Sequence, residues 1–350
     1  MKKILIITLF GLKNYGNRLQ NYAVAEIVKK LGYKPYSLRV GENDNIIIHN
    51  MKLLKRYLCH FLGIRKLPFK KSFKRFNKNI KTKEVRFDKI YTDNFTQKYD
   101  YVFLGGDQIW GAYRDKYPRD DYWFGGMFDK HKRVTMCPSF GGTWVAQEDK
   151  ELFTKYLCEF EHISIREESG AMLVKEMTGK DATVVIDPVM ALTTEEWKKV
   201  FDTKKYADND YILSCLLGKD DEVIEQKINE IASGTDIKKL YRDTPESQEG
   251  PDGFLSLIYN AKVVCTDSFH CAAFSILFKK PLIVFDRAGF DKTQTTRLMN
   301  MLVKFGLTDR YIENIDNTKY YICDYNHIDG ILDTEREKFY DFLKLTVEDI

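Results

Sequence analysis

The chain has 350 residues, of which 44% are hydrophobic and 30% are charged. This length suits two globular domains of ordinary size, and this composition is that of a globular protein rather than a disordered one. The formal net charge of +4 is too small by itself to indicate a nucleic-acid-binding protein.

The cysteines and the hydropathy both indicate a reduced, cytoplasmic protein. The seven cysteines form no Cys-x-x-Cys pair and have no metal-ligand spacing with histidine, so we expect free thiols. The apolar run at 4–10 is short and precedes no small-residue cleavage site, which favours a buried strand over a signal peptide. No stretch approaches the roughly 20 apolar residues of a spanning helix.

The first forty residues predict a strand, a loop, a helix and a second strand. The apolar run 4–8 is typical of a strand that is buried on both faces. A glycine-bearing loop at 14–17 leads into a helical pattern over 19–31, and a second strand is predicted at 36–40. This order predicts a βαβ unit.

Residues 52–89 differ in composition from the rest of the chain. The segment holds fourteen lysines and arginines against only Glu84 and Asp88, and we interpret it as a basic, partly amphipathic insertion. One interpretation is a solvated helical pair packed on its own domain. The other is a surface that rests on an anionic bilayer, which would place this cytoplasmic protein at the inner face of the membrane. No nucleic-acid-binding motif accompanies the charge, so we expect no nucleic-acid partner.

The rest of the chain alternates predicted strands with predicted helices. In the N-terminal half, further strands are predicted at 101–104, 134–136, 162–165 and 184–186. In the C-terminal half, strands at 211–217, 239–241, 263–266 and 282–285 alternate with helices at 221–231, 253–260 and 269–278. This alternation predicts parallel sheets with right-handed crossovers. Two such units facing each other would form a ligand cleft at the carboxyl ends of their strands.

We therefore predict an α/β protein made of two Rossmann-like domains that face each other across a cleft. The N-terminal domain is expected over 1–190 and includes the basic insertion, and the C-terminal domain is expected over 191–334. Pro188 closes a strand and the stretch 193–197 has the pattern of a helix start, which places the junction between the domains. An amphipathic helix within 335–350 is expected to pack back on the N-terminal domain.

The segment 260–275 carries the most specific combination of residues. A strand leads into Thr266, Asp267 and Ser268, whose short side-chain oxygens can cap the helix that follows. The amides at such a helix start attract an anion. His270 would stand in the first turn, where it can supply a proton or a positive charge near neutral pH. In the alternative, Asp267 and Ser268 only cap the helix, and His270 only packs against its neighbours.

Six segments carry characteristic motifs in a fixed order. They are Thr-Asp-Ser-Phe-His at 266–270, Asn-Tyr-Gly-Asn-Arg-Leu-Gln at 14–20, and the segments 105–110, 139–141, 164–167 and 185–188. Together they resemble the motifs of the polysaccharide pyruvyl transferase family, over about 3–310 of the chain. The resemblance implies a bacterial enzyme that uses phosphoenolpyruvate as donor. Its product would be a pyruvyl ketal on a capsule or exopolysaccharide sugar, or on the lipid-linked oligosaccharide precursor.

The resemblance also implies catalytic roles for three residues. The donor carries a carboxylate and a phosphate, which a guanidinium binds well, and Arg166 is the first candidate. Its alternative is a surface ion pair with Glu167 or Glu168. His270 would protonate carbon 3 of the enol or stabilise the departing phosphate. Asp107 is a candidate base for the sugar hydroxyl, or a loop residue that only holds backbone amides.

The candidate substrate-binding residues lie in three of the motifs and in one further segment. Uncharged polar groups of the N-terminal loop suit sugar hydroxyls or donor oxygens, although at least one is expected to cap a helix. The set is Asn14, Tyr15, Gly16, Asn17, Gln20, Gly105, Gly106, Thr266, Asp267, Ser268 and Arg297. Because histidines and carboxylates have no ligand spacing, we expect no metal and no cofactor besides the donor substrate.

Two positions depart from the pattern of the family. Gly106 stands where serine is common, and Cys271 stands where glycine is usual. These departures favour one alternative, a non-catalytic glycan-binding relative. A second alternative is a nucleotide-sugar-dependent glycosyltransferase, because two facing Rossmann-like domains of GT-B-like arrangement suit both chemistries. Thermal stabilisation by phosphoenolpyruvate, compared with nucleotide-sugars, would test the glycosyltransferase alternative. Phosphate release with a suitable acceptor would exclude the glycan-binding alternative.

Overall fold

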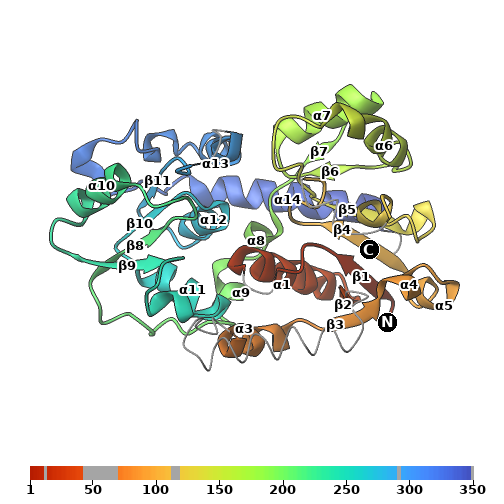
Figure 1. Cartoon of the computed structure of the whole chain (residues 1–350), viewed down its shortest axis with the longest axis horizontal. Helices are drawn as coiled ribbons and strands as arrows, with labels where there is room; N and C mark the ends of the chain where they lie inside the picture. Colours follow the sequence, from red (N-terminus) through yellow and green to blue (C-terminus); the bar gives the residue numbers. More distant parts are fainter. Residues whose placement is uncertain (12–13, 42–69, 112–118, 290–292, 348–350) are drawn as a thin grey trace, which may run out of the picture.

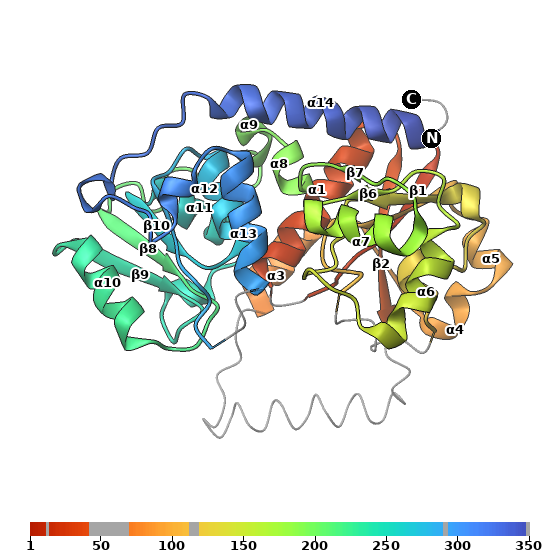
Figure 2. The same cartoon turned by 90° about the horizontal axis from the view of Figure 1, so that it is seen from above.

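The computed structural model describes residues 1–11, 14–41, 70–111, 119–289 and 293–347 (Figure 1). The two larger of three parallel sheets lie side by side, and helix α14 (Ile328–Thr346) runs along both halves (Figure 2). The predicted α/β class with two Rossmann-like, GT-B-like units is confirmed. Among the described helices, none is both long and apolar enough to cross a bilayer.

The first sheet has five parallel strands in the order β3-β2-β1-β4-β5. Their bounds are β1 (Lys3–Ile7), β2 (Lys34–Gly41), β3 (Thr82–Arg86), β4 (Tyr101–Gly105) and β5 (Arg133–Met136). Residues 4–7 of the central strand β1 are fully buried, as expected of a strand that helices cover on both faces. The chain order reverses between β1 and β4, and ligands of open α/β sheets bind beside such a switch point.

A two-stranded parallel sheet extends the first sheet beyond β5. It consists of β6 (Ser164–Ile165) and β7 (Thr183–Val184). The Ser164 amide donates to Thr135 Oγ1 at 2.7 Å, and the Ser164 hydroxyl donates to the Thr135 carbonyl at 2.7 Å. The Arg166 amide donates to the Pro138 carbonyl at 3.2 Å. These bonds hold the chain that follows β6 beside the carboxyl end of β5.

The second sheet has four parallel strands in the order β11-β10-β8-β9. Their bounds are β8 (Tyr211–Cys215), β9 (Asp236–Leu240), β10 (Val263–Thr266) and β11 (Leu282–Val284). Here the chain order reverses between β8 and β10, which creates a second switch point.

The helices pack around these sheets. Asn14 caps α1 by accepting a hydrogen bond from the Asn17 amide at 3.0 Å, and Asp187 caps α8 by accepting from the Val189 amide at 3.0 Å. Besides α14, the described α-helices are α1 (Tyr15–Lys30), α3 (Lys70–Phe76), α4 (Phe87–Ile90), α5 (Asp93–Thr96), α6 (Gln147–Leu157), α7 (Glu168–Thr178), α8 (Pro188–Ala191), α9 (Thr194–Trp197), α10 (Glu222–Ala232), α11 (Pro251–Asn260), α12 (Phe269–Leu277) and α13 (Thr293–Lys304).

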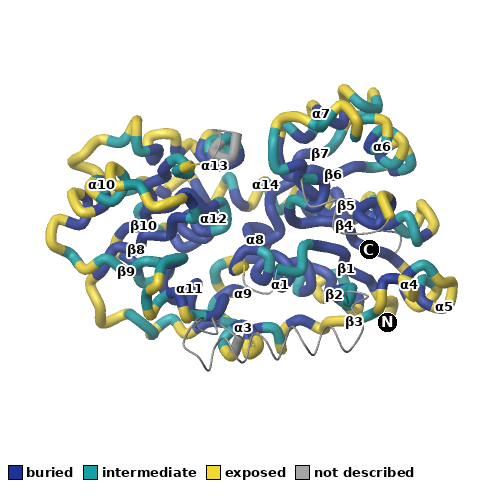
Figure 3. Tube along the Cα trace, viewed as in Figure 1, coloured by how far each residue is buried: buried dark blue, intermediate teal, exposed yellow. Residues whose placement is uncertain are grey.

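One hydrophobic core joins the two halves (Figure 3). Trp197, in the connection between them, is fully buried. The centre of its ring lies 5.4 Å from the ring centre of Tyr22 in α1 and 4.9 Å from that of Phe274 in α12. Arg336 of α14 donates to the carbonyls of Met190 and Leu192 at 3.1 and 3.2 Å. Aromatic packing of this kind fixes the halves relative to each other.

Several elements differ from the sequence predictions. Helix α1 begins at Tyr15, within the predicted loop, and β9 covers Asp236–Leu240 instead of 239–241. Residues 82–86, placed in the basic insertion 52–89, form the edge strand β3 of the first sheet. Their side chains are mostly exposed, so the strand lacks the apolar alternation that would have revealed it. Residues 52–69 lie outside the described residues. The terminal helix begins at Ile328, earlier than the predicted 335.

Candidate active site

The starts of α1 and α12 meet between the two halves. Gly16 stands in the first turn of α1, and a β-carbon at this position would collide with the imidazole of His270 in the first turn of α12. Because only glycine leaves this space, the N-terminal loop and the Thr-Asp-Ser-Phe-His segment share one site. Sequence reasoning named both segments without predicting this contact.

The loop after β4 is built around two glycines with left-handed backbone. Gly105 and Gly106 have φ angles of +118° and +88°, and a β-carbon at Gly106 would overlap the Gln20 amide. Gln20 donates to the Gly105 carbonyl at 3.1 Å and accepts from the Thr8 hydroxyl at 2.9 Å. The departure from serine at position 106 therefore matches the local packing, since only glycine adopts this backbone without strain.

Asp107 follows this loop and is buried. One carboxylate oxygen accepts from the Gln108 amide at 2.8 Å, and the other accepts from the side-chain amide of Asn17. The carboxylate therefore holds backbone in place, as one interpretation proposed, and is also bound to the start of α1 at the site.

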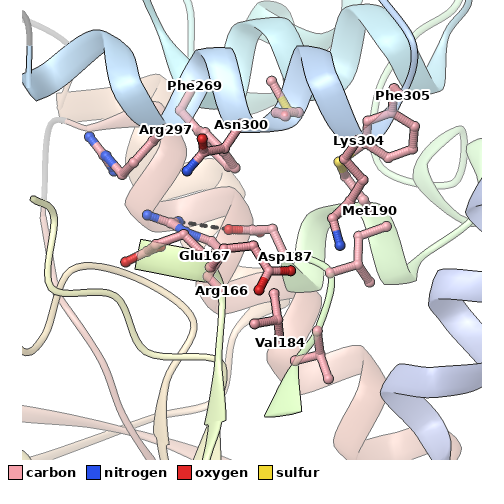
Figure 4. A pocket seen from close by; sticks show the side chains of 14 residues that line it. Arg166, Glu167, Val184, Asp187, Met190, Phe269, Arg297, Asn300, Lys304 and Phe305 are labelled. Atoms are coloured by element: carbon pink, nitrogen blue, oxygen red, sulfur yellow. Dashed lines mark hydrogen bonds and ion pairs between the residues drawn. The ribbon is translucent and has the colours of Figure 1, made fainter. Parts of the chain in front are cut away.

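Arg166 is buried, with only 3% of its side chain exposed. Its Nη1 donates to Asp187 Oδ2 at 2.8 Å, its Nε lies 3.5 Å from Glu167 Oε2, and its guanidinium carbon lies 4.5 Å from the Phe269 ring centre (Figure 4). Burial alone would lower the pKa of Arg166, but the neighbouring carboxylates raise it above its ordinary value. The ion pair with Glu167 exists, but it is internal to the protein and not on the surface.

Arg297, from α13, approaches the same aromatic ring from the other half. Its guanidinium carbon lies 6.0 Å from the Phe269 ring centre. Its two terminal nitrogens face the side-chain amide of Gln108, whose oxygen accepts from them when the amide is turned by 180°. Burial and the charge of Arg166 lower the pKa of Arg297 to about 10, so it stays cationic at neutral pH. Within the described residues its Nε has no hydrogen-bond partner.

His270 completes the cluster. Its ring stands edge-on to Phe269, with ring centres 5.5 Å apart. Its Nε2 is buried and has no hydrogen-bond partner in the described part of the chain. Burial and the two arginines lower the pKa of His270, although Asp187 and Asp107 oppose this shift. In the site without ligand the imidazole is therefore neutral at pH 7.

Other candidate residues hold the protein framework. The Asp267 carboxylate accepts from the amides of Leu217 and Gly218 at 2.7 and 2.8 Å. The Thr266 hydroxyl donates to the Cys215 carbonyl at 2.7 Å. These bonds join the ends of β8 and β10 at the second switch point. Ser268 occupies the cap position of α12 but makes no capping hydrogen bond with its side chain.

Asn14 and Tyr15 also make framework contacts. Asn14 caps α1, as described above, and the Tyr15 ring stacks on Phe254 and Phe73 with centres 4.8 and 5.2 Å away. Its hydroxyl donates to the Glu249 carbonyl at 3.1 Å. The structure thus brings His270, Arg166, Asp107, Arg297, Gly16 and Asn17 together, whereas these two side chains are bound elsewhere.

Sequence reasoning missed three members of the cluster, namely Asp187, Phe269 and Gln108, and named Glu167 only as a surface partner of Arg166. All four residues stand inside the six motifs, so the signal was present, but their pairings depend on which chain ends lie side by side. A cavity of about 60 Å³ lies beside the Arg166–Asp187 pair, between α13 and the chain after β7 (Figure 4). The volume of this cavity is far below the roughly 300 Å³ of a small ligand pocket. In the described residues no group of three or more histidine, cysteine or acidic side chains is placed to hold a metal ion.

The fold and this cluster define a two-domain α/β protein of the GT-B-like class. The structure is similar to that of a putative UDP-N-acetylglucosamine 2-epimerase from Listeria monocytogenes, with a TM-score of 0.53 and 11% identity over 97% of this chain and 90% of that chain. A UDP-GlcNAc 2-epimerase from Methanocaldococcus jannaschii has a TM-score of 0.48 and 11% identity, over 99% and 100%. A glycosyltransferase from Rickettsia africae has a TM-score of 0.44 and 11% identity, over 98% and 99%. The first of these similarities shows the fold alone.

The sequence identifies the family. The family model of polysaccharide pyruvyl transferase matches residues 14–289, which include all six motifs and the residues of the cluster except Arg297. The chain therefore belongs to the polysaccharide pyruvyl transferase family, whose name indicates a transferase. Among curated proteins, no sequence matches the chain.

Proposed function

We propose that the protein transfers the pyruvyl group of phosphoenolpyruvate to two hydroxyl groups of a sugar, forming a ketal. The acceptor would be a polysaccharide or its lipid-linked oligosaccharide precursor. The observation that carries this proposal is the convergence of Arg166, Arg297 and His270 from both halves on the Phe269 ring. A small donor with a carboxylate and a phosphate suits such a cluster of planar cations.

The two arginines would contribute differently to donor binding. Arg166 already faces the carboxylates of Asp187 and Glu167, so its charge is largely matched within the protein. Arg297 makes no direct ion pair among the described residues, although the more distant charges of Glu167 and Asp107 act on it, and it supplies the less matched positive charge. In this proposal Arg297 binds the donor anion. Arg166 positions the donor through those of its N–H groups that are not bonded to Asp187.

His270 would supply the proton in the first step. A bound dianion raises the pKa of a neighbouring imidazole, so donor binding converts the neutral ring to the imidazolium. The imidazolium protonates carbon 3, the double bond to carbon 2 opens, and the first sugar hydroxyl bonds to carbon 2 while its proton passes to Asp107. The second hydroxyl then bonds to carbon 2, the bond from carbon 2 to the phosphate oxygen breaks, and inorganic phosphate leaves with a proton.

The test is direct detection of the product. The protein is incubated with phosphoenolpyruvate and a panel of free and lipid-linked oligosaccharides, and products are analysed by mass spectrometry alongside phosphate release. We expect a pyruvate ketal and one phosphate per ketal, with neither formed by the His270→Ala variant. Glycosyl transfer from a nucleotide-sugar, with no ketal from phosphoenolpyruvate, would instead support a glycosyltransferase.

A further inference from the structure

Arg18, near the start of α1, is a fully buried cation without a hydrogen-bond partner. Its exposed fraction is 0%, and within the described ranges none of its three guanidinium nitrogens is bonded. Arg310 is equally buried, but it donates to the carbonyls of Leu282 and Ile322 at 2.9 and 2.8 Å. Buried charges in proteins are normally paired, and the described residues supply no acceptor for Arg18.

A second arginine lies beside the same aromatic ring. The guanidinium carbons of Arg18 and Arg39 lie 3.9 and 5.7 Å from the Phe10 ring centre. Arg39 is partly exposed and pairs with Glu84 at 3.2 Å. Burial and the charge of Arg39 lower the pKa of Arg18 to about 9. The ring offsets part of the desolvation of the cation, but it leaves the N–H donors without acceptors.

The position of this pair relates it to the candidate active site. Phe10 follows β1 and Arg39 lies in β2, whereas Asp107 follows β4 on the other side of β1. Asn17 bonds to Asp107, and the next residue of the same helix is Arg18. The arginine pair and the cluster around His270 therefore lie on opposite sides of β1, and α1 connects them.

We propose that Arg18 and Arg39 form an oxyanion subsite for a phosphate or carboxylate group of the acceptor. A guanidinium with unbonded N–H groups binds such groups bidentately, and an anion between the two arginines relieves their repulsion. The anion site stands on the geometry alone. Its assignment to the acceptor rests on the proposed pyruvyl transfer.

The first experiment locates the anion directly. Crystals of the full chain are soaked in sodium selenate, and anomalous diffraction identifies the oxyanion positions. We expect a peak within hydrogen-bonding distance of the Arg18 guanidinium. A peak at the Arg297–His270 cluster with none at Arg18 would overturn the subsite and leave the proposed function standing. A peak at Arg18 with none at the Arg297–His270 cluster would support the subsite and count against the proposed function.

Thermal unfolding separates a binding role from a structural one. Arg18→Met keeps the length of the side chain and removes a buried charge that has no acceptor, so we expect the Tm to rise by a few degrees. The matched variant Arg310→Met removes a satisfied guanidinium and should lower the Tm. A Tm loss in Arg18→Met as large as that in Arg310→Met would show that Arg18 is only structural.

Titration calorimetry identifies the type of anion. The background is the Arg297→Met variant, in which donor-site binding is weakened, and the probes are glucose 1-phosphate, glucuronate and glucose. Binding of glucose 1-phosphate at least tenfold tighter than glucose, lost on adding Arg18→Met, indicates a sugar phosphate. The same result with glucuronate indicates an acidic sugar. If neither anion binds more tightly than glucose, the subsite proposal is wrong.

Discussion

In the N-terminal half of the site, Arg166 is bonded to Asp187 and lies beside Glu167, whereas in the C-terminal half Arg297 lies against the amide of Gln108 and makes no direct ion pair within the described residues. Both guanidinium groups are buried against the same ring of Phe269. The difference indicates that the first charge holds the protein together and the second is kept for a ligand. His270, whose Nε2 is unbonded in the described residues, belongs with Arg297 in this comparison.

The largest effect is expected for His270→Ala. The imidazole contributes no hydrogen bond from Nε2 to the described framework, so the variant should keep its Tm within a few degrees. Turnover should fall by about 10²- to 10⁴-fold, the usual contribution of a general acid. Steady-state phosphate release, with unfolding followed by circular dichroism, checks both parts. Near-normal turnover would remove His270 from the chemistry.

Replacing each arginine by methionine tests the comparison directly. Arg166→Met leaves two buried carboxylates without their cation and should cost about 3 to 5 kcal/mol of unfolding free energy. Arg297→Met should leave stability within about 1 kcal/mol and lower kcat/KM for phosphoenolpyruvate by about 10- to 100-fold, the value of a charged hydrogen bond. Urea unfolding and kinetics of both variants are compared. Equal destabilisation of the two would abolish the distinction between the halves.

The Asp267 carboxylate should behave like the Arg166 pair, as part of the framework. Asp267→Asn keeps the shape but replaces one acceptor oxygen by a donor that faces the Gly218 amide, so we expect a loss of about 2 kcal/mol. The matched control is Asp316→Asn, where an exposed aspartate accepts from the Thr318 amide at 2.9 Å and little should change. An unchanged urea midpoint in Asp267→Asn would assign this residue to the ligand instead.

The smallest effect concerns pH. Because burial lowers the pKa of His270, the unfolded chain binds a proton more readily than the folded one. Stability should therefore fall as the pH drops through 6.5, the ordinary histidine value, toward the lower folded-state pKa. Unfolding free energies of the wild type and of His270→Gln are measured from pH 7.5 to 5.5. The wild type should lose more stability than His270→Gln over this range. Parallel curves of unfolding free energy against pH would contradict the lowered pKa of His270.

Much of the fold follows from local sequence pattern, whereas the pairings within the site do not. The strand predicted at 263–266 matches β10, because its apolar run ends at polar residues. Strand β3 was missed because an edge strand needs few apolar residues. The motifs named Arg166 and His270, and Arg297 was named from a further segment outside them. Their contacts with Asp187, Gln108 and Gly16 depend on the strand order, which brings together residues far apart in the chain.

The central claim is that the cluster between the two halves binds phosphoenolpyruvate. A crystal structure of the full chain with phosphoenolpyruvate tests it most directly. We expect the donor to contact Arg297 and His270, with its carbon 3 next to the imidazole and with Arg166 still bonded to Asp187. Phosphoenolpyruvate bound away from both Arg297 and His270 would contradict the account, and so would a crystal at saturating concentration in which no phosphoenolpyruvate is bound.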